Sequence, residues 1–166
     1  MLRTSLPLAT LVALLPSLAS ADKPSVAVMD LKARGVDEAA VGALSTEVTN
    51  ALASLRVLQV ISGEDVRRLL ALEETRQGCT GEADAACMAE IGGALGVGHL
   101  VYGEVARVGK TYSLSLVLLD TQKASAINRA NAKVDEASAL LGEIGRLARK
   151  LVAPLLEGKS GSLVLD

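Results

Sequence analysis

The pattern of apolar and polar positions predicts two strands and two helices in the first half of the chain. Short apolar runs rich in β-branched residues, Pro24–Leu31 and Val57–Ile61, are typical of buried strands. Between them, apolar residues recur at helical spacing from Val41 to Leu55, and Asp37 is suited to cap that helix. Ser62 then opens an S-G-E-D capping box, which predicts a second helix.

The second half of the chain changes from a helical period to a strand period. Asp84 is suited to cap a third helix, and Gly96 is placed to end it. From there the apolar residues alternate with a period of two. This alternation predicts three consecutive strands, at His99–Val108, Tyr112–Leu119 and Ala124–Val134. In the last strand one face is small and mainly apolar, whereas the other, with Arg129, Asn131 and Lys133, is mostly polar.

A long last helix completes the predicted order. Asp135 is suited to cap it, apolar residues recur from Leu140 to Leu155, and Pro154 is expected to end or kink it. The order β-α-β-α-α-β-β-β-α combines a parallel crossover with an antiparallel meander. The sequence therefore predicts an α/β (α+β) fold in which helices pack on a mixed β-sheet.

The first 21 residues have the features of a secretory signal peptide. Arg3 supplies a positive charge, Leu6–Leu18 is an apolar core, and the small residues that end at Ala21 form a cleavage site ahead of Asp22. The core is shorter than the roughly 20 residues of a transmembrane helix, and no cysteine near the cut could be acylated. We expect cleavage between Ala21 and Asp22 and a periplasmic mature chain without a membrane span.

Cleavage there divides the sequence into three parts. Residues 1–21 are the predicted signal peptide, and residues 22–157 are the predicted α/β domain. Residues 158–166 form a tail whose strand-like SLVLD segment could pair with a sheet edge or begin a further domain.

Composition argues against several classes of function. The formal net charge is −2 and no block of Lys and Arg is present, whereas a phosphate backbone demands clustered positive charge. The chain has no Phe or Trp and two Tyr, so it is poor in the aromatic anchors of tight interfaces and sugar sites. We expect neither nucleic acid nor a cofactor as a partner.

Cys79 and Cys87 are predicted to form a disulfide, because the chain is bound for an oxidising compartment. The chain-entropy relation gives about 2.5 kcal/mol for so short a loop. A redox pair is the alternative, since Cys87 falls in the first turn of a predicted helix, but the C-x-x-C spacing of such enzymes is lacking. With His99 as the single histidine, the cysteines cannot complete a tetrahedral metal site.

No other residue pattern predicts an active site. Asp30, Glu104 and Asp120 lie at or near predicted strand ends, where catalytic carboxylates occur, but turn formers and solvated carboxylates are commoner there. Gly92 and Gly93 match neither a dinucleotide fingerprint nor a P-loop, and we interpret them as sites of close helix packing. The sequence therefore predicts no catalytic residue, no cofactor site, no metal site and no enzyme.

Four segments resemble a superfamily of cell-envelope domains. They are AVMDL (Ala27–Leu31), LSTEVTNAL (Leu44–Leu52), VLQVISGEDVRRLLALEE (Val57–Glu74) and AEIGGALGVGHLVYGEVARVGKTYSLSLVLLDTQKA (Ala89–Ala124). Together they resemble the periplasmic domain of the curli secretion channel CsgG, the amino-terminal domain of TolB, the flagellar protein FlgO and the lipoprotein activators of penicillin-binding proteins. The resemblance covers about Ser25 to Leu155.

The resemblance implies an exported, non-enzymatic domain that docks onto other envelope proteins or onto copies of itself. Three features of the family are lacking: the lipoprotein cysteine, the membrane hairpins of CsgG and the propeller of TolB. The predicted function is a periplasmic binding or scaffold domain in a secretion, motility or cell-wall machine. The alternatives are a self-assembling periplasmic ring and a thiol-redox protein using Cys79 and Cys87. The outer faces of the 98–134 meander and the Cys79–Cys87 loop are the expected contact surfaces.

Overall fold

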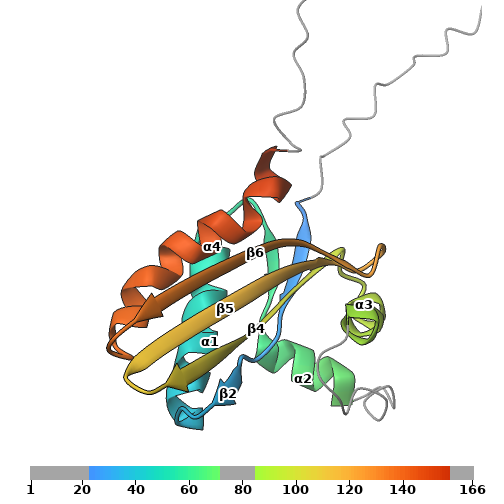
Figure 1. Ribbon diagram of the computed structural model, residues 1–166. Helices are drawn as coiled ribbons and strands as arrows, with labels where there is room; N and C mark the ends of the chain where they lie inside the picture. The colour runs from blue at the N-terminus through green and yellow to red at the C-terminus, as the bar shows by residue number, and fades with distance from the viewer. Residues whose placement is uncertain (1–22, 72–84, 158–166) are drawn as a thin grey trace, which may run out of the picture.

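The computed structural model describes residues 23–71 and 85–157, which form one mixed sheet with helices packed on it (Figure 1). The strands are β1 (Ser25–Val28), β2 (Lys32–Arg34), β3 (Gln59–Ile61), β4 (His99–Val108), β5 (Thr111–Asp120) and β6 (Ser125–Val134). Their order is β3-β1-β4-β5-β6, and β2 pairs with β4. Strand β1 runs parallel to β3 and β4, whereas β4, β5 and β6 form an antiparallel meander. The predicted fold class and the meander are confirmed.

The described residues also form four helices, α1 (Glu38–Ser54), α2 (Gly63–Ala71), α3 (Ala85–Ala94) and α4 (Ala139–Glu157). Helices α1 and α4 lie behind the sheet in Figure 1, whereas α2 and α3 lie at its right-hand side. Within the described parts of the chain, no helix is long and apolar enough to cross a membrane.

Two apolar clusters lie on opposite faces of the sheet. The larger one joins α1 and α4 to alternate strand residues, including Val101, Val105, Leu114, Leu116 and Leu118. The smaller one joins the intervening strand residues Ala27, Leu100 and Leu119 to Val66 of α2 and Met88 of α3. Because successive strand side chains point to opposite faces, the period of two sorts residues between these clusters.

Side-chain caps fix the starts of α1 and α2, as the sequence predicts. The Asp37 carboxylate accepts a hydrogen bond from the Ala40 amide at 3.0 Å. The Ser62 hydroxyl accepts from the Asp65 amide at 3.2 Å and donates to the Asp65 carboxylate at 2.6 Å. Gly96 follows α3 with φ +65°, the left-handed conformation expected of a residue that ends a helix.

Strand β2 is a feature that the sequence pattern did not predict. Val28 pairs with Val101 and Lys32 pairs with Glu104, so Met29–Leu31 hold one residue more than the facing stretch of β4. This is a β-bulge. It turns Leu31 into the core, where the Leu31 amide donates to the buried Ser45 hydroxyl at 3.0 Å. The predicted strand Pro24–Leu31 is therefore interrupted after Val28.

The last helix begins later than predicted and continues past Pro154. Asp135 does not cap α4, which begins at Ala139, because the preceding residues form tight turns: the Ala139 amide donates to the Glu136 carbonyl at 3.1 Å. Pro154 does not end the helix, which continues to Glu157. The predictions for Asp84, for the signal peptide with its cleavage site at Ala21 and Asp22, and for residues 158–166 lie outside the described residues.

The helix tolerates Pro154 because a strand residue replaces the hydrogen bond that proline cannot make. Proline has no amide hydrogen, so the carbonyl of Lys150, four residues earlier, loses its helical donor. The Asn128 side-chain amide on β6 donates to that carbonyl at 2.8 Å and to the Leu151 carbonyl at 3.0 Å. Asn128 therefore joins the sheet to the end of α4.

Candidate functional site

One face of the meander is left largely uncovered by the helices and is the main candidate surface. It is the face opposite α1 and α4, and it points towards the viewer in Figure 1. We call it the open face. Strand register assigns to it the side chains that alternate with the core: Lys32, Arg34, Tyr102, Glu104, Ala106, Ser113, Ser115, Val117, Arg129, Asn131 and Lys133. The side chains on β2 and β6 are exposed, those in the middle of the face are half-buried, and Val117 is buried. That the outer face of the meander is a contact surface stays a prediction.

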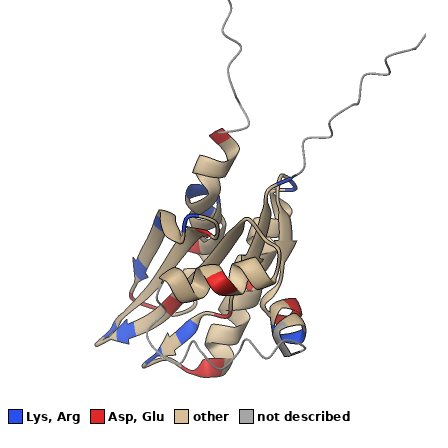
Figure 2. Cartoon of the chain, turned by 90° about the vertical axis from the view of Figure 1, so that its right-hand side faces the viewer, with Lys and Arg blue, Asp and Glu red and all other residues tan. Residues whose placement is uncertain are grey.

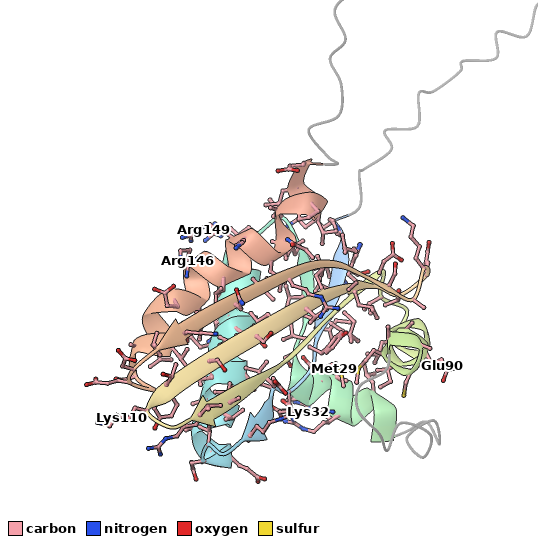
Figure 3. All side chains as sticks on the ribbon, viewed as in Figure 1. Met29, Lys32, Glu90, Lys110, Arg146 and Arg149 are labelled. Carbon is pink, nitrogen blue, oxygen red and sulfur yellow. The ribbon has the colours of Figure 1, made fainter. Side chains whose placement is uncertain are left out.

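A hollow of about 330 Å³ lies on the open face beside α3. Its apolar lining includes Met88, Tyr102 and Val117, and basic residues from both sides of the sheet, Lys32 and Arg129, border it. Met29 and Lys32, which come from either side of the β1–β2 junction, lie at this side of the sheet near α2 (Figure 3). Asp30 and Glu104 also line it, so the hollow combines an apolar floor with charged residues of both signs around it.

Basic residues dominate the charge of the open face. Lys32 and Arg34 come from β2, Arg129 and Lys133 come from β6, and all four are exposed. Of the open-face residues named above, Glu104 alone is acidic, and it forms an ion pair with Arg34 at 3.3 Å. The whole chain has a net charge of −2, and its charged residues are spread over strands and helices (Figure 2). The open face is therefore locally positive on an acidic protein.

Asp30 serves to hold α2 in place at the C-terminal end of β1. Its carboxylate forms an ion pair with Arg67 of α2. A Cβ atom on Gly63 would lie 2.5 Å from one Asp30 carboxylate oxygen and 3.3 Å from the Val28 carbonyl, so α2 begins directly against β1. Asp30 and Glu104 both border the hollow, but each carboxylate is paired with an arginine. This arrangement supports structural roles for both.

Asp120 forms the turn that the sequence predicts, away from the hollow. Its carboxylate accepts hydrogen bonds from the amides of Gln122 at 2.9 Å and Lys123 at 3.0 Å. The Lys123 amide is the main reason that the pKa of Asp120 lies below its ordinary value, and the Gln122 amide and the charges of Lys123 and His99 lower that pKa further. His99 faces Asp120 across the strand pair, and its Nδ1 is buried without a hydrogen-bond partner among the described residues.

Replacing Asp120 with asparagine should make the stability of the protein less dependent on pH. The pKa of Asp120 is lower in the folded chain, so its ionised form stabilises the fold fully above the unfolded pKa, about 3.9. That stabilisation disappears as the pH falls through the folded pKa. The difference in stability between the wild type and Asp120→Asn, measured by urea unfolding, should therefore be constant from pH 7 to about pH 5 and shrink as the pH falls below about 4. A difference that stayed constant from pH 7 to pH 3 would contradict this role.

The two adjacent glycines of α3 have different environments. A Cβ atom on Gly92 would collide with the Thr121 side chain and lie 3.7 Å from Val97, whereas nothing lies within 4 Å of one on Gly93. The Thr121 hydroxyl also donates to the Val97 carbonyl at 2.6 Å. Close packing is therefore confirmed for Gly92 and is wrong for Gly93.

The remaining predicted site residues are only partly within the described chain. Cys87 lies on α3, half-buried, but Cys79 lies outside the described residues. The Cys79–Cys87 disulfide and its redox alternative both stay predictions. Within residues 23–71 and 85–157, no cluster of three His, Cys, Asp or Glu side chains is arranged to hold a metal ion.

Sequence reasoning identified two of the four basic residues of the open face. The alternation of 124–134 placed Arg129 and Lys133 together on the polar side of their strand, and the structure confirms that placement. Lys32 and Arg34 were missed, because the strand that carries them was not predicted. Their i, i+2 spacing was the available signal, but a three-residue exposed segment gives too short a pattern to assign.

Comparison with known proteins shows similarity in structure rather than in sequence. No protein-family model and no curated protein matches the chain. The C-terminal domain of LpoB from Escherichia coli matches with a TM-score of 0.53 and 16% identity, over 69% of this chain and 84% of that one. Lipoprotein GNA1162 from Neisseria meningitidis matches with a TM-score of 0.51 and 18% identity, over 84% of this chain and 99% of that one.

TolB from Acinetobacter baumannii is a further structural match. Its TM-score is 0.51 at 14% identity, and the match covers 82% of this chain but 29% of TolB. The chain therefore shares its fold with the C-terminal domain of LpoB and with the matched part of TolB. The resemblance inferred from the sequence is thereby confirmed at the level of the fold.

Proposed function

We propose that this chain is a non-enzymatic binding or scaffold domain of the cell envelope, which docks onto another envelope protein through its open face. The observation that carries the proposal is the asymmetry of the sheet. One face of the meander is buried under α1 and α4, whereas the other presents three strands of ten residues each without a helix over most of their length.

Two further observations support a binding role. The carboxylates of Asp30 and Glu104 border the same hollow, but each is paired with an arginine, and the Asp120 carboxylate is used in a turn, so none of the three stands free as an acid–base group would. The fold is shared with GNA1162, which is a lipoprotein, and with LpoB and TolB. Together with the predicted signal peptide, this likeness favours the periplasm as the site of action. We also propose that the domain acts in a secretion, motility or cell-wall machine.

Photocrosslinking in intact cells tests which face makes contact. A photoreactive residue at Asn131, exposed on the open face, is compared with one at Arg149, exposed on α4. We expect Asn131 to crosslink to an exported protein that mass spectrometry identifies, and Arg149 to give no such product. Equal labelling from both positions, or none from Asn131, would remove the open face as the docking surface. Crosslinks only between copies of this chain would favour the self-assembling ring instead.

A further inference from the structure

We infer that the open face binds an extended, acidic polypeptide segment, one apolar side chain of which enters the hollow over Tyr102 and Val117. The inference rests on the proposed function, because it names the chemistry of the partner for the same surface. It follows from the arrangement of charge, from the shape of the floor between the charges, and from three cations that have no ion-pair partner among the described residues.

The basic residues form two rows on either side of the open face. Lys32 and Arg34 stand on β2, Arg129 and Lys133 stand on β6, and β4 and β5 lie between them. At about 4.8 Å between neighbouring strands, the rows are about 14 Å apart. An extended peptide fits between them with room for side chains on both sides.

The spacing within a row matches an extended acidic peptide. Lys32 and Arg34 are two residues apart on one strand, and side chains on one face of a strand repeat about every 6.8 Å. Alternate carboxylates of an extended segment repeat at the same distance. Arg129 and Lys133, four residues apart, match every second carboxylate of such a segment.

Three of these cations lack an ion-pair partner in the described part of the chain. Arg34 pairs with Glu104, but Lys32, Arg129 and Lys133 have no carboxylate within ion-pair distance among the described residues. Complementary charge on a partner would increase the rate and the specificity of binding. A second copy docked face to face would instead bring the basic rows of both copies together.

The floor between the rows suits a polypeptide backbone. Ala106, Ser113 and Ser115 are small, so a chain could approach the sheet closely there, and the carboxylate of Glu104 on the same floor is paired with Arg34. At the α3 end the floor drops into the 330 Å³ hollow beside Met88, Tyr102 and Val117. A liquid water molecule takes about 30 Å³, so the hollow has the room for one apolar side chain of the partner.

The first test uses two synthetic peptides and the mature full-length chain. One fluorescent dodecapeptide repeats Glu-Gly-Glu-Leu, and its counterpart has Lys in place of every Glu. Fluorescence anisotropy should show binding of the acidic peptide, at least tenfold weaker in 0.5 M salt than at low salt, because salt screens exposed charges. Replacing Leu by Ser in the acidic peptide should also weaken binding. Equal binding of the Lys peptide, or no effect of Leu to Ser, would overturn the inference.

The second test uses two variants with the same change in net charge. Arg129→Glu combined with Lys133→Glu reverses one row, whereas Arg146→Glu combined with Arg149→Glu alters exposed residues of α4 (Figure 3). We expect the first variant to bind the acidic peptide at least tenfold more weakly, and the second to bind as the wild type does. Circular dichroism checks that both are folded. Equal losses in the two variants would show general electrostatic attraction and overturn the site.

The outcomes separate this inference from the proposed function. If the acidic peptide does not bind but Asn131 still crosslinks an envelope protein, the acidic partner is wrong and docking through the open face stands. If Asn131 gives no crosslink, the proposed function fails as well. Duplex DNA or anionic vesicles can be tested in the same assay. If either binds through Arg129 and Lys133 more tightly than the acidic peptide does, the partner is a nucleic acid or a membrane and not an acidic protein.

Discussion

Replacing Gly103 with alanine should lower the free energy of unfolding by about 3 kcal/mol, as overpacking of a core does. A Cβ atom there would overlap the backbone carbonyl oxygen of Ser115 on β5 and lie 3.1 Å from Cδ2 of the buried Leu116. Neither neighbour can move freely, because β5 is hydrogen-bonded to strands on both sides. Urea unfolding followed by circular dichroism measures the loss.

Gly93→Ala is the matched control for that experiment. Gly93 lies within α3, where no atom would come within 4 Å of the new methyl group. Alanine is a better helix former than glycine by up to about 1 kcal/mol, so this variant should be slightly more stable than the wild type. If the two alanine variants had the same stability, the close approach of β4 and β5 at Gly103 would not be a packing constraint.

Asn128→Asp should cost about 2 kcal/mol of stability at pH 7, because it removes a donor from two helix carbonyl groups and faces them with a charge. The two side chains have nearly the same shape, so the change isolates the hydrogen bonds to the Lys150 and Leu151 carbonyls. Asn131→Asp, an exposed change on the other face of β6, should cost little. Thermal unfolding of both variants beside the wild type provides the comparison.

A second substitution tests whether Asn128 acts by replacing the proline amide. In a Pro154→Ala background, the new amide at position 154 can donate to the Lys150 carbonyl. The Asn128→Asp substitution should then cost less than it does with proline present, which a double-mutant cycle detects as coupling. Strictly additive effects of the two substitutions would show that the asparagine and the proline act independently.

The meander could be predicted because its alternation is long and one of its faces is fully buried. His99–Val108 was predicted with the bounds that the structure shows, since Val101 and Val105 alternate there with half-buried or exposed residues. The hydrogen bonds by which Asn128 compensates for Pro154 could not be predicted from the sequence near either residue. Asn128 and Lys150 are 22 residues apart in sequence, and only the packing of α4 on β6 brings them together.

The candidate site could be predicted only in part, for a similar reason. The polar side of β6 follows from its own alternation, so Arg129 and Lys133 were placed together. Strand β2 has three residues, all of them exposed, and it is a strand because β4 offers it a hydrogen-bonding edge. Neither the strand propensity nor the periodicity of Lys32–Arg34 indicates that tertiary contact, so two of the four basic residues of the open face could not be predicted.

The single extra residue between β1 and β2 reverses which side chains of β2 point to each face of the sheet. If strict alternation continued from the buried Val28, Lys32 and Arg34 would point into the core and Ala33 would point outward. The insertion reverses this assignment, so one continuous stretch of chain supplies apolar side chains to the inner layer and then cations to the opposite surface. At this position chain length, rather than residue type, decides whether the sheet presents charge to a partner, and a one-residue change in length is a step that evolution can take in either direction.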